Sequence, residues 1–437
     1  MDHSRLSQEI RLWVEDHREE AIGLIAQLVQ IPSVNHPPNG DEAEYQRYLA
    51  EWMKEEGAEV DSYELDEVPG LQEHPAYMSG RNYVNRPNVV GSFFGGSGRS
   101  IMFSGHADTV YQGHEPWNFP PFSGKVHDGK LYGRGAYDMK GGMAAALIAV
   151  RCLKALAIPI GGKVYIESVV DEEHGGANGT LAGRLRGPHP DIAIIPEPSN
   201  LKLYPAHLGG GIWKATFEGK SGIGFNGEEL VSALEATVEF ANLLRAFGTY
   251  RMQQQPKHPM WVNGKVPEVT LLSIYSGDAS RELQEKLPAT GEINFWIEAY
   301  PGVTGEEIIA DLWSYYEDQR LNYPSLQKCH PTIKPLIRYL SGSEMAQNDN
   351  TKDLLKLAAE TGHRVLGRPV GPPQGSPFAC DGFIFNLYSD TPALILGPGG
   401  ANAHAADEYL DLEGYEQLIH WYAELIIKWC GLLPAKG

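Results

Sequence analysis

The chain has 437 residues, of which 42% are hydrophobic and 21% are charged, a composition typical of a soluble globular protein with more than one domain. Its net charge of −20 argues against a surface that binds nucleic acid or anionic membranes. The four cysteines lie far apart, the N-terminus opens a charged amphipathic segment, and no apolar run is long enough for a membrane span. We therefore expect reduced thiols and a cytoplasmic protein.

The first part of the chain predicts two helices and a strand before any residue of chemical interest. Apolar residues at helical spacing predict a helix over about 7–30, which Pro32 ends, and a second helix over 41–56. A strand over 58–65 follows. Residues 66–87 are rich in proline, glycine and aromatic residues, and we expect them to form an ordered excursion rather than a linker.

Acids and histidines then follow the ends of successive apolar strands. His106 comes directly after a strand that begins at about residue 100, at the position where open α/β sheets bind ligands, and Asp108 could orient its ring. Asp138 lies in a glycine-flanked turn at a helix start, where it is either a helix cap or a rigidly held ligand.

The next strand, over 163–170, ends in Asp171, Glu172 and Glu173. Three adjacent acids are either an acidic surface turn or a cluster that bound cations stabilise, and the stretch taken alone favours the surface turn. Glu197 repeats the pattern, because it follows the apolar strand over 192–195. His404 follows the strand over 392–396 and a run of glycines.

The alternation of strands and helices breaks between about 210 and 335, where the pattern predicts an antiparallel α+β domain inserted into the first. We expect a catalytic domain in two parts, 1–209 and 336–437, and an inserted domain over 210–335. The fold class is α/β, with a mostly parallel sheet flanked by helices.

Several acids and histidines on one edge of a sheet make chance a poor explanation. Two histidines and three carboxylates without a thiolate suit zinc, manganese or cobalt. If Asp138 bridges, two metal ions each receive one histidine, one terminal acid and a share of the bridge. Two such ions can hold a hydroxide and polarise a carbonyl, and Glu172 would be left to move the proton.

The sequence resembles the dinuclear zinc amidohydrolases and peptidases, a family that includes acetylornithine deacetylase, succinyl-diaminopimelate desuccinylase, aminoacylase and glutamate carboxypeptidase. The motifs that carry the resemblance are residues 104–110 (SGHADTV), 133–142 (GRGAYDMKGG), 171–173 (DEE), 196–198 (PEP) and His404 with 407–409 (DEY). Their order and spacing cover nearly the whole chain.

The resemblance implies a role for each matching position. It implies that His106, Asp138 and Glu197 hold one metal ion, and that Asp138, Glu173 and His404 hold the other. It implies that Glu172 is the general acid and base and that Asp108 is the partner of His106. It also implies a zinc exopeptidase-like fold in which the inserted domain is a lid that mediates a homodimer.

Two departures from the family concern the substrate. Ile223 stands where relatives carry a histidine that helps to hold the substrate, and 292–296 (EINFW) lacks the arginine that binds a substrate carboxylate. His207 and Arg281 are candidate substitutes. Asp381 resembles a family position near the site and is either a partner of the site or a helix cap.

We therefore predict a metal-dependent enzyme that hydrolyses an N-acyl or N-formyl amide C–N bond of a small molecule, with two divalent ions, of which zinc is the first choice and cobalt or manganese the others. A dipeptidase or carboxypeptidase on the same centre is the competing reading. A metal-binding protein without catalysis is a third, and the acid at Glu172 argues against it, because a structural site needs no unligated carboxylate there.

Overall fold

A computed structural model describes residues 3–254, 257–261, 266–277 and 285–434. The contacts divide the chain into two compact units, one of residues 1–206, 344–376 and 381–437 and one of 207–343 and 377–380. Each unit has its own hydrophobic core.

The first unit is built on a six-stranded sheet with the order β17-β9-β5-β8-β4-β3. The strands are β3 (Glu59–Tyr63), β4 (Asn88–Phe93), β5 (Ile101–His106), β8 (Val164–Val169), β9 (Ile192–Ile195) and β17 (Ala393–Ile395). The four from β17 to β8 are parallel, whereas β4 and β3 are antiparallel to their neighbours. The predicted α/β class with a mostly parallel sheet is confirmed.

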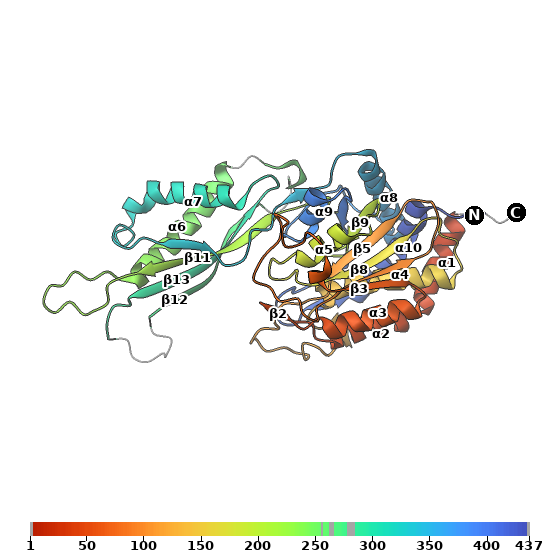
Figure 1. Cartoon of the computed structure of the whole chain (residues 1–437), viewed down its shortest axis with the longest axis horizontal. Coiled ribbons are helices and arrows are strands. Elements are labelled where there is room, and N and C mark those ends of the chain that lie inside the picture. The colour runs from red at the N-terminus through yellow and green to blue at the C-terminus, as the bar shows by residue number, and fades with distance from the viewer. Residues whose placement is uncertain (1–2, 255–256, 262–265, 278–284, 435–437) are drawn as a thin grey trace. The chain divides into compact units, whose positions relative to one another are not determined.

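Helices cover both faces of this sheet, as α5 and α3 show in Figure 1, where they lie on opposite sides of its strands. The helices of the unit are α1 (His3–Asp16), α2 (Arg18–Gln30), α3 (Ala43–Glu55), α4 (Gly141–Ala155), α5 (Asn178–Arg186), α8 (Asp349–Leu366), α9 (Gly382–Tyr388) and α10 (Leu412–Cys430). The apolar helix α4 packs against α10, α2 and β5 and forms the centre of the core.

One expected helix is two. The segment predicted as a single helix over 7–30 is divided between α1 and α2 at His17, whose backbone leaves the helical region with φ −106° and ψ 19°. The His17 ring stacks on Trp13, with ring centroids 4.0 Å apart, and its Nδ1 hydrogen-bonds the Trp13 carbonyl. Apolar periodicity continues across such a break, so the sequence pattern does not reveal it.

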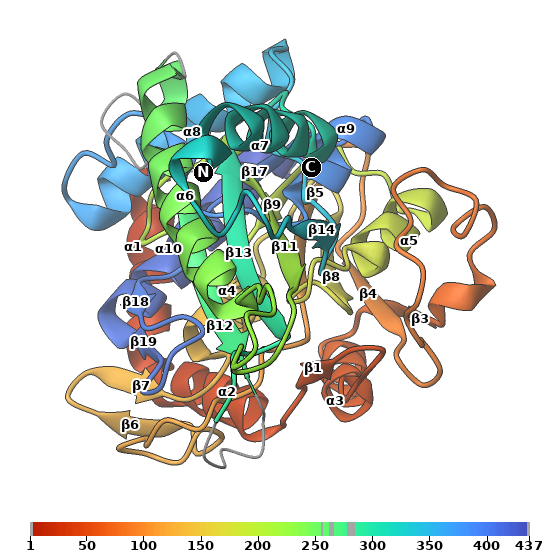
Figure 2. The same ribbon diagram turned by 90° about the vertical axis from the view of Figure 1, so that its left-hand side faces the viewer.

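A small sheet with the order β18-β19-β7-β6 lies beside the main one within the first unit (Figure 2). Its strands are β6 (Lys125–His127), β7 (Lys130–Tyr132), β18 (Gly400–Ala401) and β19 (Tyr409–Asp411). The remaining short strands are β1 (Asn35–His36) and β2 (Asn39–Gly40), which form a hairpin, and β10 (Ala206–His207), β15 (Ser343–Glu344) and β16 (Gly375–Ser376).

The second unit is an antiparallel sheet of order β12-β13-β11-β14 with α6 and α7 on one face (Figure 1). Its strands are β11 (Gly209–Glu218), β12 (Val269–Ser276), β13 (Thr290–Ala299) and β14 (Thr332–Pro335), and its helices are α6 (Ala233–Gln254) and α7 (Gly305–Gln319). Thr304 and Glu307 form a capping box at the start of α7. No helix in the described part of the chain is long and apolar enough to cross a membrane.

Candidate metal centre

His106 is the last residue of β5, and its side chain is buried. Its Nδ1 lies 2.8 Å from the main-chain carbonyl of Asp108, an arrangement in which Nδ1–H donates and Nε2 keeps its lone pair. Nε2 faces two carboxylates, 3.3 Å from Asp138 Oδ1 and 3.6 Å from Glu197 Oε1. The ring is therefore oriented as a metal ligand requires.

Asp108 acts on His106 through its main chain rather than through its carboxylate. Its Oδ1 is 3.7 Å from His106 Nδ1, too far for a hydrogen bond. The carboxylate instead accepts hydrogen bonds from the backbone N–H groups of Glu172 and Glu173, at 3.1 and 3.0 Å, and from the Asn35 amide at 2.8 Å. Asp108 thus holds the turn that carries the two glutamates, a contact that the spacing of His106 and Asp108 does not suggest.

Asp138 lies between the two histidines, with its oxygens 3.3 Å from His106 Nε2 and 3.3 Å from His404 Nε2. It belongs to the short segment Ala136–Lys140 that leads into α4, and its own backbone is not helical, with φ −117° and ψ 95°. The buried carboxylate of Glu408 accepts hydrogen bonds from the backbone N–H groups of Tyr137 and Asp138, both at 3.0 Å, and from the Arg134 guanidinium at 2.6 Å. Glu408 therefore fixes the Asp138 turn, and only its place in a family motif marked it in the sequence.

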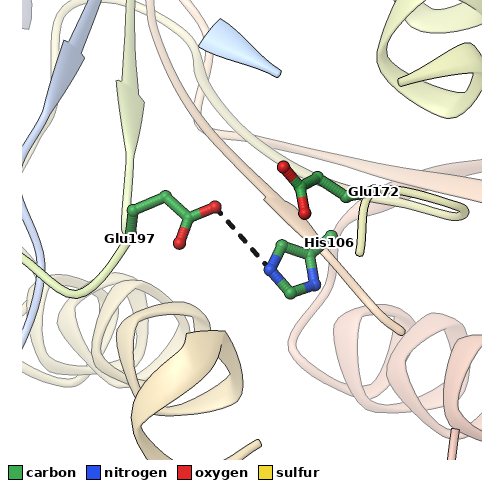
Figure 3. Close-up of side chains that lie close together, drawn as sticks. All are labelled: His106, Glu172 and Glu197. Carbon is green, nitrogen blue, oxygen red and sulfur yellow. Dashed lines mark ion pairs between the residues drawn. The ribbon is translucent and has the colours of Figure 1, made fainter. Parts of the chain in front are cut away.

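Glu172, Glu173 and Glu197 follow β8 and β9 by two to four residues, at the carboxyl ends of parallel strands. Glu173 Oε2 lies 2.9 Å from His404 Nε2. Figure 3 shows the carboxyl groups of Glu172 and Glu197 directed toward the same space beside the His106 ring.

His404 reaches the cluster from a different element than its position in the sequence suggests. It does not end a strand of the main sheet but lies in the turn between β18 and β19, with φ 63° and a side chain that is 53% exposed. The glycine-rich run after β17 carries the chain from the main sheet to the small one.

Burial and crowding of like charges shape the proton affinities. Burial raises the pKa of Glu172 and of Glu197 well above the usual range, and nearby carboxylates add to the rise for Glu197. Burial works against a charged His106, but the hydrogen bond that the protonated ring donates to the Asp138 carboxylate and the charges of the neighbouring glutamates outweigh it, so that the pKa of His106 is raised. Burial likewise opposes ionisation of Asp138, yet hydrogen bonds from both imidazoles lower its pKa.

The donor atoms suit divalent cations. Donor atoms of His106, Glu172 and Glu197, and those of His106, Asp138 and Glu173, lie within 4.8 Å of one another in each set. Glu173 Oε1 is buried without a hydrogen-bond partner among the described residues, which is expensive for a carboxylate unless a cation is beside it. Four carboxyl groups facing two imidazoles also leave negative charge that bound cations would balance. The residues present therefore fit metal ions.

The remaining candidates from the sequence are a possible partner of the site, Asp381, and three residues considered for substrate binding. Asp381 is buried and accepts a hydrogen bond from Thr180, and although it precedes α9 its side chain makes no capping hydrogen bond. His207 is buried with both ring nitrogens engaged, at 2.9 Å from the Leu208 carbonyl and 2.8 Å from Ser343 Oγ. Ile223 is 56% exposed in the loop after β11, and Arg281 lies outside the described residues.

Fold and site together define a metal-dependent hydrolase: His106 and three glutamates lie at one edge of a mostly parallel α/β sheet, and Asp138 and His404 reach them from neighbouring segments. Residues 102–428 match the model of peptidase family M20/M25/M40. The chain belongs to that family, and the predicted class, a metal-dependent hydrolase of amide C–N bonds, is confirmed.

The chain is similar over its full length to two bacterial enzymes named N-formyl-4-amino-5-aminomethyl-2-methylpyrimidine deformylase. The one from Halalkalibacterium halodurans is 26% identical over 459 residues, covering 98% of each chain. The one from Bacillus subtilis is 26% identical over 452 residues, covering 95% of this chain and 96% of that protein. In structure the chain is similar to the dipeptidase Dug1p from Saccharomyces cerevisiae, with a TM-score of 0.77, 16% identity and coverage of 98% and 99%.

Proposed function

We propose that this protein is a deformylase that removes the formyl group from an N-formyl amine without an α-carboxylate, such as an N-formyl aminomethyl-pyrimidine. The observation that carries the proposal is the end-to-end similarity to two enzymes that bear this activity in their names. The substrate side agrees with it. Where relatives of this family place a histidine that helps to hold the substrate, the chain has the exposed, apolar Ile223, and 292–296 lacks the arginine that relatives use for a substrate carboxylate.

We propose that His106, Asp138 and Glu197 hold one divalent ion and that Asp138, Glu173 and His404 hold the other. The 3.3 Å contacts of Asp138 with both imidazoles support a bridging role for its two oxygens. Zinc suits this set of nitrogen and oxygen donors, and cobalt and manganese suit it as well. When bound, the ions polarise the amide carbonyl and make water acidic enough to attack it.

In this scheme the protein's own groups move the proton and hold the geometry. Glu172 takes the proton of the attacking water and passes it to the leaving amine nitrogen, and its raised pKa, caused by burial, suits both halves of that transfer. Asp108 holds the Glu172 backbone through hydrogen bonds, and Glu408 holds that of Asp138.

The four described cysteines form no disulfide, which supports a reducing, cytoplasmic location.

A substrate screen tests the proposal. Purified protein loaded with zinc, cobalt or manganese is incubated with N-formyl, N-acetyl and N-succinyl amines, with and without an α-carboxylate, and with dipeptides. We expect N-formyl amines without a carboxylate to give the highest kcat/KM, read as release of formate. Turnover confined to carboxylate-bearing substrates would refute the reading of Ile223, and turnover of dipeptides alone would make the protein a dipeptidase.

A further inference from the structure

The ordered excursion of residues 66–87, between β3 and β4, has no part in the scheme above. It lies against the loop that carries Glu172 and Glu173, which runs from the end of β8 to the start of α5. Three polar side chains make the contact, all of them buried. The Arg81 side chain is 4% exposed, and the residues Tyr83 and Asn178 are 2% and 0% exposed.

The contacts bracket the two glutamates on both sides. Before them, the Tyr83 hydroxyl donates to Asp171 Oδ2 at 2.6 Å. After them, an Arg81 guanidinium N–H donates to the His174 carbonyl at 2.7 Å. At the end of the loop, the Asn178 amide pairs with the main chain of Met78 in both directions, at 2.9 and 2.7 Å.

Two of these contacts are joined to each other and to the site. Asn178 Nδ2 also donates to the Tyr83 oxygen at 2.7 Å. The Asn35 amide nitrogen donates to Asp171 at 3.0 Å and to Asp108 at 2.8 Å, and Asp108 in turn accepts from the backbone of Glu172 and Glu173. A continuous buried network therefore runs from the excursion to the two glutamates.

The loop needs such support because its backbone is unfavourable on its own. Asp171 and Ala177 have φ values of 64° and 55°, in the left-handed region that residues with a Cβ seldom adopt, and Gly175 has φ 69°. A Cβ on Gly176 would lie 1.9 Å from the Asp171 carbonyl oxygen. Surrounding contacts must over-determine a conformation of this kind for it to persist.

We propose that residues 66–87 are a positioning clamp, in which Tyr83 and Arg81 hold the turn of Glu172 and Glu173 in its working geometry. The expected effect on kcat rests on the proposed function. Tyr83 and Arg81 are positioning residues, since they act through Asp171 and the His174 carbonyl and touch neither glutamate's carboxyl group in the contacts described. A displacement of about 1 Å in such a group costs a rate of the order of a hundredfold.

Tyr83→Phe is the decisive variant, because it deletes one oxygen and keeps the ring. We expect kcat to fall about ten- to a hundredfold on an N-formyl amine with KM unchanged within threefold and with the metal content of the wild type. Hydrogen exchange should become faster in peptides spanning 171–178 and stay unchanged elsewhere. Arg81→Ala should act in the same direction, and Arg81→Lys should restore part of the loss.

Tyr48→Phe is the matched control, since it removes an exposed hydroxyl of α3 that donates to Gln27 of α2 at 2.6 Å and should change neither readout. Unchanged kcat and unchanged exchange in Tyr83→Phe would overturn the clamp. So would faster exchange throughout the protein, which would mean general destabilisation. If wild-type protein hydrolyses no N-formyl amine, the proposed function fails, and the exchange of 171–178 still decides the clamp.

Discussion

Glu172 and Glu173 are adjacent in the chain, yet their carboxyl groups have different partners. Glu173 lies 2.9 Å from His404, whereas the donor atoms of Glu172 group with those of His106 and Glu197. Geometry alone would therefore allow Glu172 to be a ligand. Its assignment to proton transfer is a claim about chemistry that a variant can test.

Glu172→Gln keeps the shape of the side chain and removes the base. We expect kcat to fall by at least about a thousandfold, within the range that general acid–base catalysis contributes. Elemental analysis should still find two metal ions per chain. In the matched variant Glu173→Gln, by contrast, metal should be lost along with activity. Loss of metal from Glu172→Gln would show that the roles of the two glutamates are reversed.

His207 offers a second test at the scale of one residue. Burial lowers the pKa of His207 to about 4, and its Nδ1 faces the Leu208 carbonyl while Nε2 faces the Ser343 hydroxyl. The neutral ring is therefore the folded form. Because the unfolded chain binds a proton at the ordinary value of about 6.5, stability is fully present above that pH and falls as the pH drops toward 4.

Between pH 7 and pH 5 this linkage costs about 2 kcal/mol of the free energy of unfolding. Between pH 7 and pH 5, the free energy of unfolding should therefore fall by about 2 kcal/mol less in His207→Gln than in the wild type. Urea unfolding at both pH values measures this difference. His363→Gln, at an exposed position of α8, is the control, and it should lose as much stability between the two pH values as the wild type does. Equal losses in wild type and His207→Gln would mean that burial does not lower the pKa of His207 in the folded protein.

Sequence reasoning finds residues whose chemistry is local and misses those that act through the main chain. His106, Glu173 and Glu197 were predictable because each follows an apolar strand, and parallel strands bring their carboxyl ends to one edge. Asn35 was not, and Glu408 was marked only by its place in a family motif, because their hydrogen bonds to the site depend on loops that no periodicity describes. The same holds for the Asp108 carboxylate, whose partners are backbone N–H groups 64 and 65 residues away.

At the scale of elements, the start of α4 fixes the distance between two parts of the site. A Cβ on Gly142 would lie 2.1 Å from the carbonyl oxygen of Pro196, the residue before Glu197. Since the obstacle is backbone, a side chain at this position would push α4 away from the end of β9. The sequence shows Asp138 in a glycine-flanked turn, and the structure shows which neighbour one of these glycines, Gly142, must accommodate.

Gly142→Ala should therefore lower the free energy of unfolding by about 1–3 kcal/mol, the usual cost of overpacking, and should weaken metal retention on dialysis. Gly23→Ala is its control, because that glycine lies inside α2 and a Cβ there meets nothing within 4 Å. The control should be stabilised by about 0.5–1 kcal/mol through helix propensity. If both variants behave alike in chemical unfolding, the close contact of Gly142 with Pro196 is not a constraint.

At the scale of the whole molecule, one edge of the second unit is apolar where it faces solvent. β12 is the terminal strand of its sheet, and among the described residues of this strand Leu272, Ile274 and Tyr275 are 50%, 43% and 62% exposed. An exposed apolar edge strand is a site for pairing with another chain. We propose that two copies of β12 pair about a twofold axis, which would give the homodimer through the inserted domain that the family resemblance implies.

Ile274→Asp places a charge on that strand and should prevent the proposed dimer from forming. We expect sedimentation at micromolar concentration to give a dimer for the wild type and a single chain for the variant, with unfolding by urea little changed. Leu12→Asp, at a position of α1 that is 42% exposed, should remain dimeric and controls for a charge at an exposed leucine. A wild-type protein that sediments as a single chain, or an Ile274→Asp variant that stays dimeric, would remove β12 from the interface.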